Sequence, residues 1–287
     1  MPRITVHGAD LHYDDTAFGD ATPAVFAHGL LWSGAMFDPQ VEALRAERRC
    51  VRFDFRSQGR SAYSDEGNDI DTLTDDAVAV IESLGVAPCH FVGLSMGGFV
   101  GLRIAAARPD LLRSLTLIAS AADPEPRRNV PKYRAMLLGA RFTGLRPFVP
   151  AVMKIMFGES FLRDPARADE RAALAAKLAA LDPKGVRRAT EGVIGRRGVT
   201  HLLGRIHTPT QVISGEGDTA VVPARARRTA AAIAGARFVA IPRAGHTTTL
   251  EEPALVTAAL REFFAKVEDD DEPEEAGERA SVILPRR

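Results

Sequence analysis

One short stretch, Gly93-Leu94-Ser95-Met96-Gly97, places a serine between an apolar run and an alanine-rich run. Residues 90–94 predict a buried strand, and residues 96–108 predict a helix. A G-x-S-x-G motif at such a turn is typical of a nucleophilic serine, because small residues on either side let the strand and helix backbones approach closely. The helix N-terminus then directs free N–H groups toward a developing oxyanion. We therefore predict that Ser95 attacks a carbonyl group.

A serine hydroxyl needs a base and an orienting acid to become reactive at neutral pH. Of the seven histidines, His246 in "IPRAGHTTTLEEP" has the best position, since it directly follows the last predicted strand. Asp218 in "VISGEGDTAVVP" is the favoured acid, in the loop after the preceding strand. Glu216 nearby and Asp123 farther away stay open as alternatives for the acid.

The oxyanion needs backbone donors. The first is the N–H of the residue after the nucleophile, Met96. The motif predicts a second donor in the loop after an earlier strand, and "AHGLLWSG" supplies that loop. Gly29 allows the chain to turn so that the Leu30 N–H faces inward. His28 is expected to hold this loop through hydrogen bonds rather than to act as a base.

Strand and helix patterns alternate along most of the chain, which predicts an α/β fold with a mostly parallel sheet and helices on both faces. Residues 3–8 and 11–19 predict an opening hairpin. Further strands are expected at 23–29, 50–55, 90–94, 111–120, 208–215 and 236–242, and helices at 35–47, 71–85, 96–108, 222–235 and 250–267.

The alternation stops in the middle of the chain, where residues 122–203 contain no convincing strand and predict a small helical lid. The expected organisation is therefore a first core segment at 1–121, the lid or cap at 122–203, a second core segment at 204–267 and an acidic, disordered tail at 268–287.

Apolar residues of the lid could either pack it on the core or line a substrate pocket. Met153 and Phe157 in the lid, with Trp32 beside the oxyanion loop, are the candidates for substrate binding. Two arginines, Arg196 and Arg197, could recognise a substrate carboxylate, although exposed arginines are usually only solvated.

Composition excludes several classes of partner. The chain of 287 residues has 37 basic and 37 acidic residues, so no charge bias points to nucleic acid or an anionic membrane. Its N-terminus lacks a secretory pattern and no apolar run is long enough to span a bilayer, which favours a cytoplasmic location. Cys50 and Cys89 have no metal-ligand spacing and are expected to be buried thiols.

The order of "HGLLW", "FDFRSQGRS", "GLSMGG", "GEGD" and "AGH" resembles the α/β-hydrolase superfamily, over residues 4 to about 266. Within it, the sequence is similar to 3-oxoadipate enol-lactonases, cofactor-free perhydrolases and small esterases. The resemblance implies an eight-stranded sheet with a lid after the sixth strand, and no metal or organic cofactor. It also implies a triad of Ser95, His246 and Asp218. Ser57 departs from the glycine that relatives commonly have there, which puts the local turn geometry in question.

The expected function is hydrolysis of a carboxylic ester or lactone, macrocyclic lactones included, through an acyl-enzyme. The partner is a small-molecule substrate. Two alternatives stay open: C–C bond hydrolysis or perhydrolysis on the same triad, and a ligand receptor that has kept the hydrolase fold without being an enzyme. The geometry of the lid decides which substrate fits.

Overall fold

The computed structural model describes residues 2–270, and its centre is one eight-stranded sheet in the order β1-β2-β4-β3-β5-β6-β7-β8. Only the pairs β1/β2 and β2/β4 are antiparallel, and the other strands run parallel. The mostly parallel sheet expected from the sequence is therefore confirmed. The strands are β1 (Arg3–Val6), β2 (Ala9–Asp15), β3 (Ala21–Ala27), β4 (Arg48–Phe53), β5 (Cys89–Leu94), β6 (Leu112–Ile118), β7 (Thr210–Gly215) and β8 (Arg237–Ile241).

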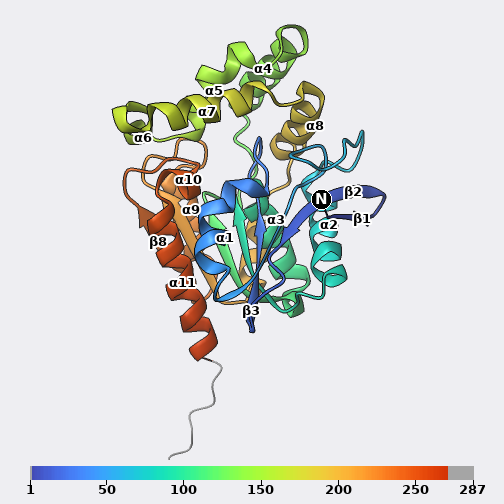
Figure 1. Cartoon of the computed structure of the whole chain (residues 1–287), viewed down its shortest axis with the longest axis vertical. Coiled ribbons are helices and arrows are strands. Elements are labelled where there is room, and N and C mark those ends of the chain that lie inside the picture. Colours follow the sequence, from blue (N-terminus) through green and yellow to red (C-terminus); the bar gives the residue numbers. More distant parts are fainter. Residues whose placement is uncertain (1, 271–287) are drawn as a thin grey trace, which may run out of the picture.

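Helices cover both faces of the sheet (Figure 1). On one face, α2 (Ile70–Ser83) packs on α3 (Met96–Ala107), and α9 (Pro223–Ala231) packs on β7. On the other face, α1 (Asp38–Leu44) contacts α11 (Pro253–Asp269) and the short α10 (Thr248–Glu251). Every residue of β5 and of β7 is buried, as expected for parallel strands that are covered on both sides.

Only helices are found between β6 and β7 in this part of the described chain (Figure 1). We call residues 122–203 the helical insertion. It lies beyond the carboxyl ends of the parallel strands, and Asp182 caps α8 by accepting hydrogen bonds from the N–H groups of Lys184 and Gly185, both at 3.1 Å. Its helices are α4 (Val130–Thr143), α5 (Val149–Met156), α6 (Glu159–Arg163), α7 (Ala168–Ala179) and α8 (Pro183–Ile194).

Short 3₁₀ turns join several of these elements. They are η1 (Gly34–Phe37), η2 (Pro109–Leu111), η3 (Arg146–Phe148), η4 (Pro165–Arg167) and η5 (Thr200–Arg205). No helix among residues 2–270 is both long and apolar enough to cross a bilayer.

The end of the chain differs in one detail from the sequence expectation. Helix α11 continues to Asp269, so the predicted acidic tail begins inside the helix, and Glu268 accepts hydrogen bonds from Arg48 at 2.8 Å. The rest of that predicted tail, residues 271–287, lies outside the described residues. Cys50 and Cys89 are free and buried, as expected.

Candidate active site

Ser95 occupies a strained turn between β5 and α3. Its φ of 49° and ψ of −105° lie where residues with a side chain are rarely found. A Cβ atom on Gly93 would come within 2.3 Å of the Gly97 carbonyl oxygen, and one on Gly97 within 2.0 Å of the Ala27 carbonyl oxygen. The close backbone approach predicted from the G-x-S-x-G spacing is therefore confirmed. The turn is held by the Ser95 N–H, which donates to the Ile118 carbonyl at 2.8 Å.

His246 and Asp218 lie in the loops that follow β8 and β7. The His246 Nδ1 is 2.9 Å from the Asp218 Oδ2, and both side chains are buried. The other carboxylate oxygen of Asp218 accepts the N–H groups of Ala220 at 2.8 Å and Val221 at 2.9 Å. With Nδ1–H donated to this fixed carboxylate, Nε2 of the imidazole is left to accept a proton.

The two alternative acids lie elsewhere. Glu216 is exposed, and Asp123 pairs with Arg225 at 3.2 Å and with Arg228 at 3.3 Å. The structure thus brings Asp218, and neither alternative, to the imidazole of His246.

Opposing effects set the pKa of His246. Burial by itself lowers it, but the charge of Asp218 and its hydrogen bond raise it, with a further contribution from Glu251, and the net pKa lies above the ordinary value. A histidine whose cation is stabilised in this way is suited to take up a proton during a reaction and to return it.

Glu251, a buried carboxyl group in α10, was not predicted from the sequence. Its Oε2 accepts the N–H of Gly158 at 2.7 Å and that of Gly245 at 2.9 Å. It thereby joins the helical insertion to the loop that carries His246. Burial is the largest cause that raises its pKa, to about 7. The sequence feature that could have pointed to Glu251 is its position five residues after His246.

The expected oxyanion loop is held on both sides of Leu30. The Gly29 N–H donates to the Met36 Sδ at 3.4 Å, and the Leu31 N–H donates to the Gln58 Oε1 at 3.2 Å. Among residues 2–270, the Leu30 N–H has no hydrogen-bond acceptor. Met96 begins α3, so its N–H has no acceptor within the helix either.

Gln58 is a second residue of the site that was not predicted from the sequence. Besides holding Leu31, its Nε2 lies 3.6 Å from the Met96 Sδ. One buried amide therefore contacts both segments that were expected to supply oxyanion donors.

His28 holds the same loop, as predicted. Its Nδ1 lies 2.7 Å from the Gly29 carbonyl oxygen, and its Nε2 accepts the Phe55 N–H at 3.0 Å. Burial lowers the pKa of His28, and a neutral ring fits both bonds, with Nδ1 as donor and Nε2 as acceptor.

Ser57, the departure from the glycine of relatives, has a φ of 60°. Its Oγ accepts the Ser64 N–H at 3.0 Å and donates to the Ser64 carbonyl at 3.1 Å. These two bonds help to hold a backbone conformation that glycine adopts more easily.

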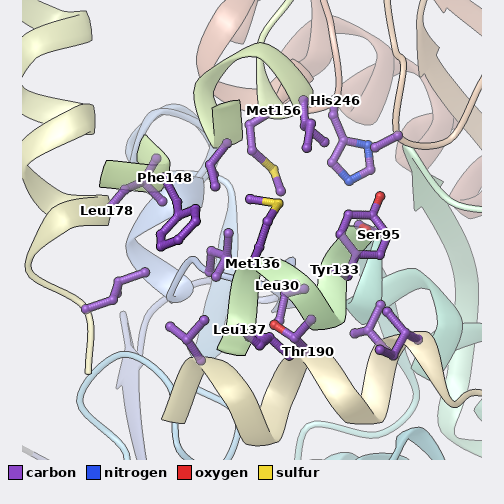
Figure 2. A pocket seen from close by; sticks show the side chains of 18 of the residues that line it. Leu30, Ser95, Tyr133, Met136, Leu137, Phe148, Met156, Leu178, Thr190 and His246 are labelled. Carbon is purple, nitrogen blue, oxygen red and sulfur yellow. The ribbon is translucent and has the colours of Figure 1, made fainter. Parts of the chain in front are cut away.

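Ser95, His246 and Leu30 line one cavity of about 130 Å³ under the helical insertion (Figure 2). In Figure 2 the imidazole of His246 is directed to the side of the cavity where Ser95 lies. Apolar side chains form most of the remaining wall, among them Met136, Leu137, Phe148, Val152, Met156 and Leu178. Within residues 2–270 nothing bonds the Ser95 hydroxyl, so it is free to turn toward His246 or a substrate.

Few polar side chains interrupt this wall. Tyr133 of α4 directs its hydroxyl toward His246 in Figure 2. Glu125 and Arg196 lie where the chain enters and leaves the insertion, and they form an ion pair of 3.1 Å. From the sequence, Arg196 was expected either to recognise a carboxylate or to be an exposed, solvated arginine, but its side chain is only 2% exposed. Arg197, its companion in that hypothesis, is exposed and does not line the cavity.

The prediction of three substrate-binding residues needs a correction. Trp32, Met153 and Phe157 are not among the residues that line the cavity. All three belong to a buried hydrophobic cluster, in which Trp32 packs edge-on against Phe157 with ring centroids 6.0 Å apart. Packing of the insertion on the core, the alternative left open by the sequence, accounts for them. Met156 and Phe148 line the cavity in their place.

Metal-binding side chains do not gather in the described part of the chain, where no group of three or more His, Cys, Asp or Glu could hold an ion.

Comparison with known proteins gives consistent matches. The model of the "Alpha/beta hydrolase family" matches residues 24–259. The enol-lactonase of Burkholderia xenovorans LB400 is 30% identical, with a TM-score of 0.84 over 92% of this chain and 100% of that one. A thermophilic esterase from Thermogutta terrifontis is 27% identical, with a TM-score of 0.85 over 93% of this chain and 99% of that one. The Mycobacterium tuberculosis protein named "Putative non-heme bromoperoxidase BpoC" is 30% identical over 90% of this chain and 98% of its own length.

Proposed function

Because the chain belongs to the alpha/beta hydrolase family and has its fold, we propose that it hydrolyses a carboxylic ester or lactone with Ser95 as nucleophile. His246 is the proposed base and Asp218 the acid that orients it. The observation that carries this proposal is the 2.9 Å contact between His246 and Asp218 at a cavity whose wall also contains the strained Ser95.

The proposed reaction has two halves. As the Ser95 oxygen attacks the carbonyl carbon, His246 takes the hydroxyl proton and the carbonyl oxygen becomes an oxyanion at the N–H groups of Leu30 and Met96. Collapse of this intermediate breaks the bond to the alcohol oxygen, which receives the proton from His246, and leaves an acyl-enzyme. Water then attacks the acyl carbon and gives a proton to His246. When this second intermediate collapses, the bond to the Ser95 oxygen breaks, that oxygen takes the proton back from His246, and the acid is released.

The cavity supports an apolar substrate. Aliphatic and methionine side chains form most of its wall, so an acyl or alcohol chain would be removed from water there. Each buried methylene group contributes about 0.8 kcal/mol to binding by that mechanism.

The test is hydrolysis of p-nitrophenyl esters, simple lactones and macrocyclic lactones, with acid release followed directly. Wild-type protein should turn over at least one class, and a substrate whose acyl-enzyme is hydrolysed slowly should leave an acyl group that mass spectrometry locates on Ser95. Full activity of Ser95→Ala, or an acyl group on another residue, would contradict the proposal.

The same triad could transfer the acyl group to hydrogen peroxide instead of water, and the name of the BpoC relative favours testing this second function. Adding peroxide to an ester assay should then yield a peracid in place of part of the acid. Product analysis distinguishes the two outcomes, and both require Ser95.

A further inference from the structure

Arg196 is the most unusual polar group in the wall of the cavity. Its Nη1 donates to the Glu125 Oε2 at 3.1 Å and to the Val193 carbonyl at 2.8 Å. Its Nε and Nη2 are buried and have no acceptor among residues 2–270. A buried donor without an acceptor costs about 1–3 kcal/mol, so two of them call for an explanation.

The surroundings of the guanidinium place it close to the reacting serine. Its carbon atom lies over the ring of Phe99, 4.0 Å from the ring centroid. Phe99 lies one helical turn after Ser95 in α3, and its N–H donates to the Ser95 carbonyl at 3.0 Å. Arg196, Phe99 and Ser95 all line the same cavity.

Charge balance around Arg196 argues against a second carboxylate there. Glu125 already neutralises Arg196, and it lines the cavity as well. The neighbouring arginines have carboxylates of their own, since Arg225 pairs with Asp123 at 3.2 Å and Arg103 pairs with Asp71 at 2.6 Å. A further anion would bring an uncompensated negative charge into an apolar cavity, which is costly.

We propose that Arg196 is a specificity-determining residue that donates, through Nε and Nη2, to a neutral oxygen acceptor on the substrate. The preferred substrate is then an uncharged ester or lactone with a second oxygen, such as a keto, hydroxyl or ether oxygen, several bonds from the scissile carbonyl. This inference rests on the proposed ester or lactone hydrolysis and narrows its substrate class.

The experiment uses matched esters of one chain length. One is a plain octanoyl p-nitrophenyl ester, three carry a keto group at C3, C5 or C7, and one ends in a carboxylate. A parallel set places the same groups in the alcohol portion. For the wild type, at least one keto ester should exceed its plain counterpart in kcat/KM by about tenfold to a hundredfold, as expected for a hydrogen bond to a charged donor.

Variants of Arg196 and Glu125 distinguish a loss of substrate recognition from a loss of folding. Arg196→Met should lose the keto preference while it still hydrolyses the plain ester, and Arg196→Lys, which keeps the charge beside Glu125, should lose most of it. Glu125→Gln keeps an acceptor for Arg196 but removes the negative charge, so it should raise the relative kcat/KM of the carboxylate ester. Arg103→Met is the matched control, because Arg103 is a buried, paired arginine on α3 that does not line the cavity.

Three results would overturn this inference. The first is a wild type without any preference among neutral esters, and the second is an unchanged keto preference in Arg196→Met and Arg196→Lys. The third is a wild-type preference for the carboxylate ester, which would assign Arg196 to an anionic group. Hydrolysis of the plain ester that depends on Ser95 would leave the proposed function standing in each case.

Discussion

Two groupings of serine, histidine and carboxylate lie at opposite ends of the sheet. Hydrogen bonds link all three residues at the amino ends of the strands, whereas at the carboxyl ends they link His246 and Asp218 and leave the Ser95 hydroxyl unbonded among residues 2–270. At the amino ends of the strands, the Ser114 Oγ is 2.7 Å from the His90 Nδ1, and the His90 Nε2 is 3.1 Å from the Glu268 Oε1. At the carboxyl ends are His246, Asp218 and Ser95. Strand β5 contributes to both, since His90 lies near its start and Ser95 directly follows its end.

The backbone distinguishes the two serines. Ser114 is a regular strand residue that pairs with His90 across neighbouring strands, and both are fully buried. Neither lines the cavity under the helical insertion. Ser95 instead stands on a strained turn at a helix N-terminus and reaches that cavity. We therefore expect the hydrogen-bonded pair of Ser114 and His90 to be inactive, because a nucleophile also needs access to substrate and oxyanion donors.

Electrostatics distinguishes the two histidines. Burial is the largest effect on His90 and lowers its pKa to about 4, although Glu268 acts in the opposite direction. For His246 the effects of Asp218 and Glu251 outweigh burial and raise the pKa. His90 also stacks on Phe264, with centroids 4.1 Å apart, and so behaves as part of the core.

The largest expected difference between the two groupings concerns their serines. Ser95→Ala should lower kcat for ester hydrolysis by about 10⁴-fold or more, because no acyl-enzyme can form. Ser114→Ala should change kcat by less than about threefold and lower mainly the stability, since it removes one buried hydrogen bond. Steady-state kinetics of both variants on one ester checks this. Equal losses would show that Ser114 takes part in the reaction.

Replacing the carboxylate of each grouping should give almost as large a difference in kcat. Asp218→Asn should lower kcat by about 10³-fold, since an amide neither stabilises the imidazolium nor fixes the tautomer of His246. It should also move the acidic limb of the pH profile of kcat/KM to lower pH, because the charge that raises the pKa of His246 is removed. Glu268→Gln is the control, and a comparable loss of kcat in that variant would contradict the comparison.

The grouping at the amino ends of the strands should make the free energy of unfolding depend on pH. His90 has a pKa of about 4 in the folded protein and an ordinary value of 6.5, so the unfolded state binds its proton first as the pH falls. Its contribution is therefore present above about pH 6.5 and is lost toward pH 4, by about 3 kcal/mol at most. Urea unfolding at several pH values checks this. In a His90→Asn variant the free energy of unfolding should change less with pH. If it changes as steeply as in the wild type, His90 is not the cause.

The smallest expected effect concerns the support of the oxyanion loop. Gln58→Ala should lower kcat/KM by about tenfold, because the Leu31 N–H loses its acceptor at 3.2 Å and the Leu30 donor is held less firmly. Gln211→Ala is the matched control, since Gln211 is a buried amide of β7 that contacts Thr116 away from the cavity. It should lower stability without changing kcat/KM. The same loss of kcat/KM in both variants would mean that Gln58 has no special role.

Much of the core could be predicted from the sequence because its signals are local. The strand runs, the G-x-S-x-G turn and the polar residues after β7 and β8 each carry their own pattern of hydrophobicity and glycine. Parallel strands then bring their carboxyl ends to one edge, which is why Ser95, Asp218 and His246 could be proposed together. The family assignment and the fold agree with those signals.

The walls of the cavity were decided by tertiary structure. Apolar residues of the insertion carry the same pattern whether they face the core or a cavity, so the sequence left both packing and substrate binding open for Met153 and Phe157, as it did for Trp32 in the oxyanion loop. The structure places all three in a buried hydrophobic cluster. The burial of Arg196 beside Glu125 and the contacts of Glu251 join residues far apart in the chain, and no local pattern records such pairs. The sequence by itself thus determined the strand-end positions of the proposed reacting groups, because these depend on local turns. Only the tertiary structure determined which side chains a substrate would meet, because that depends on how the insertion packs.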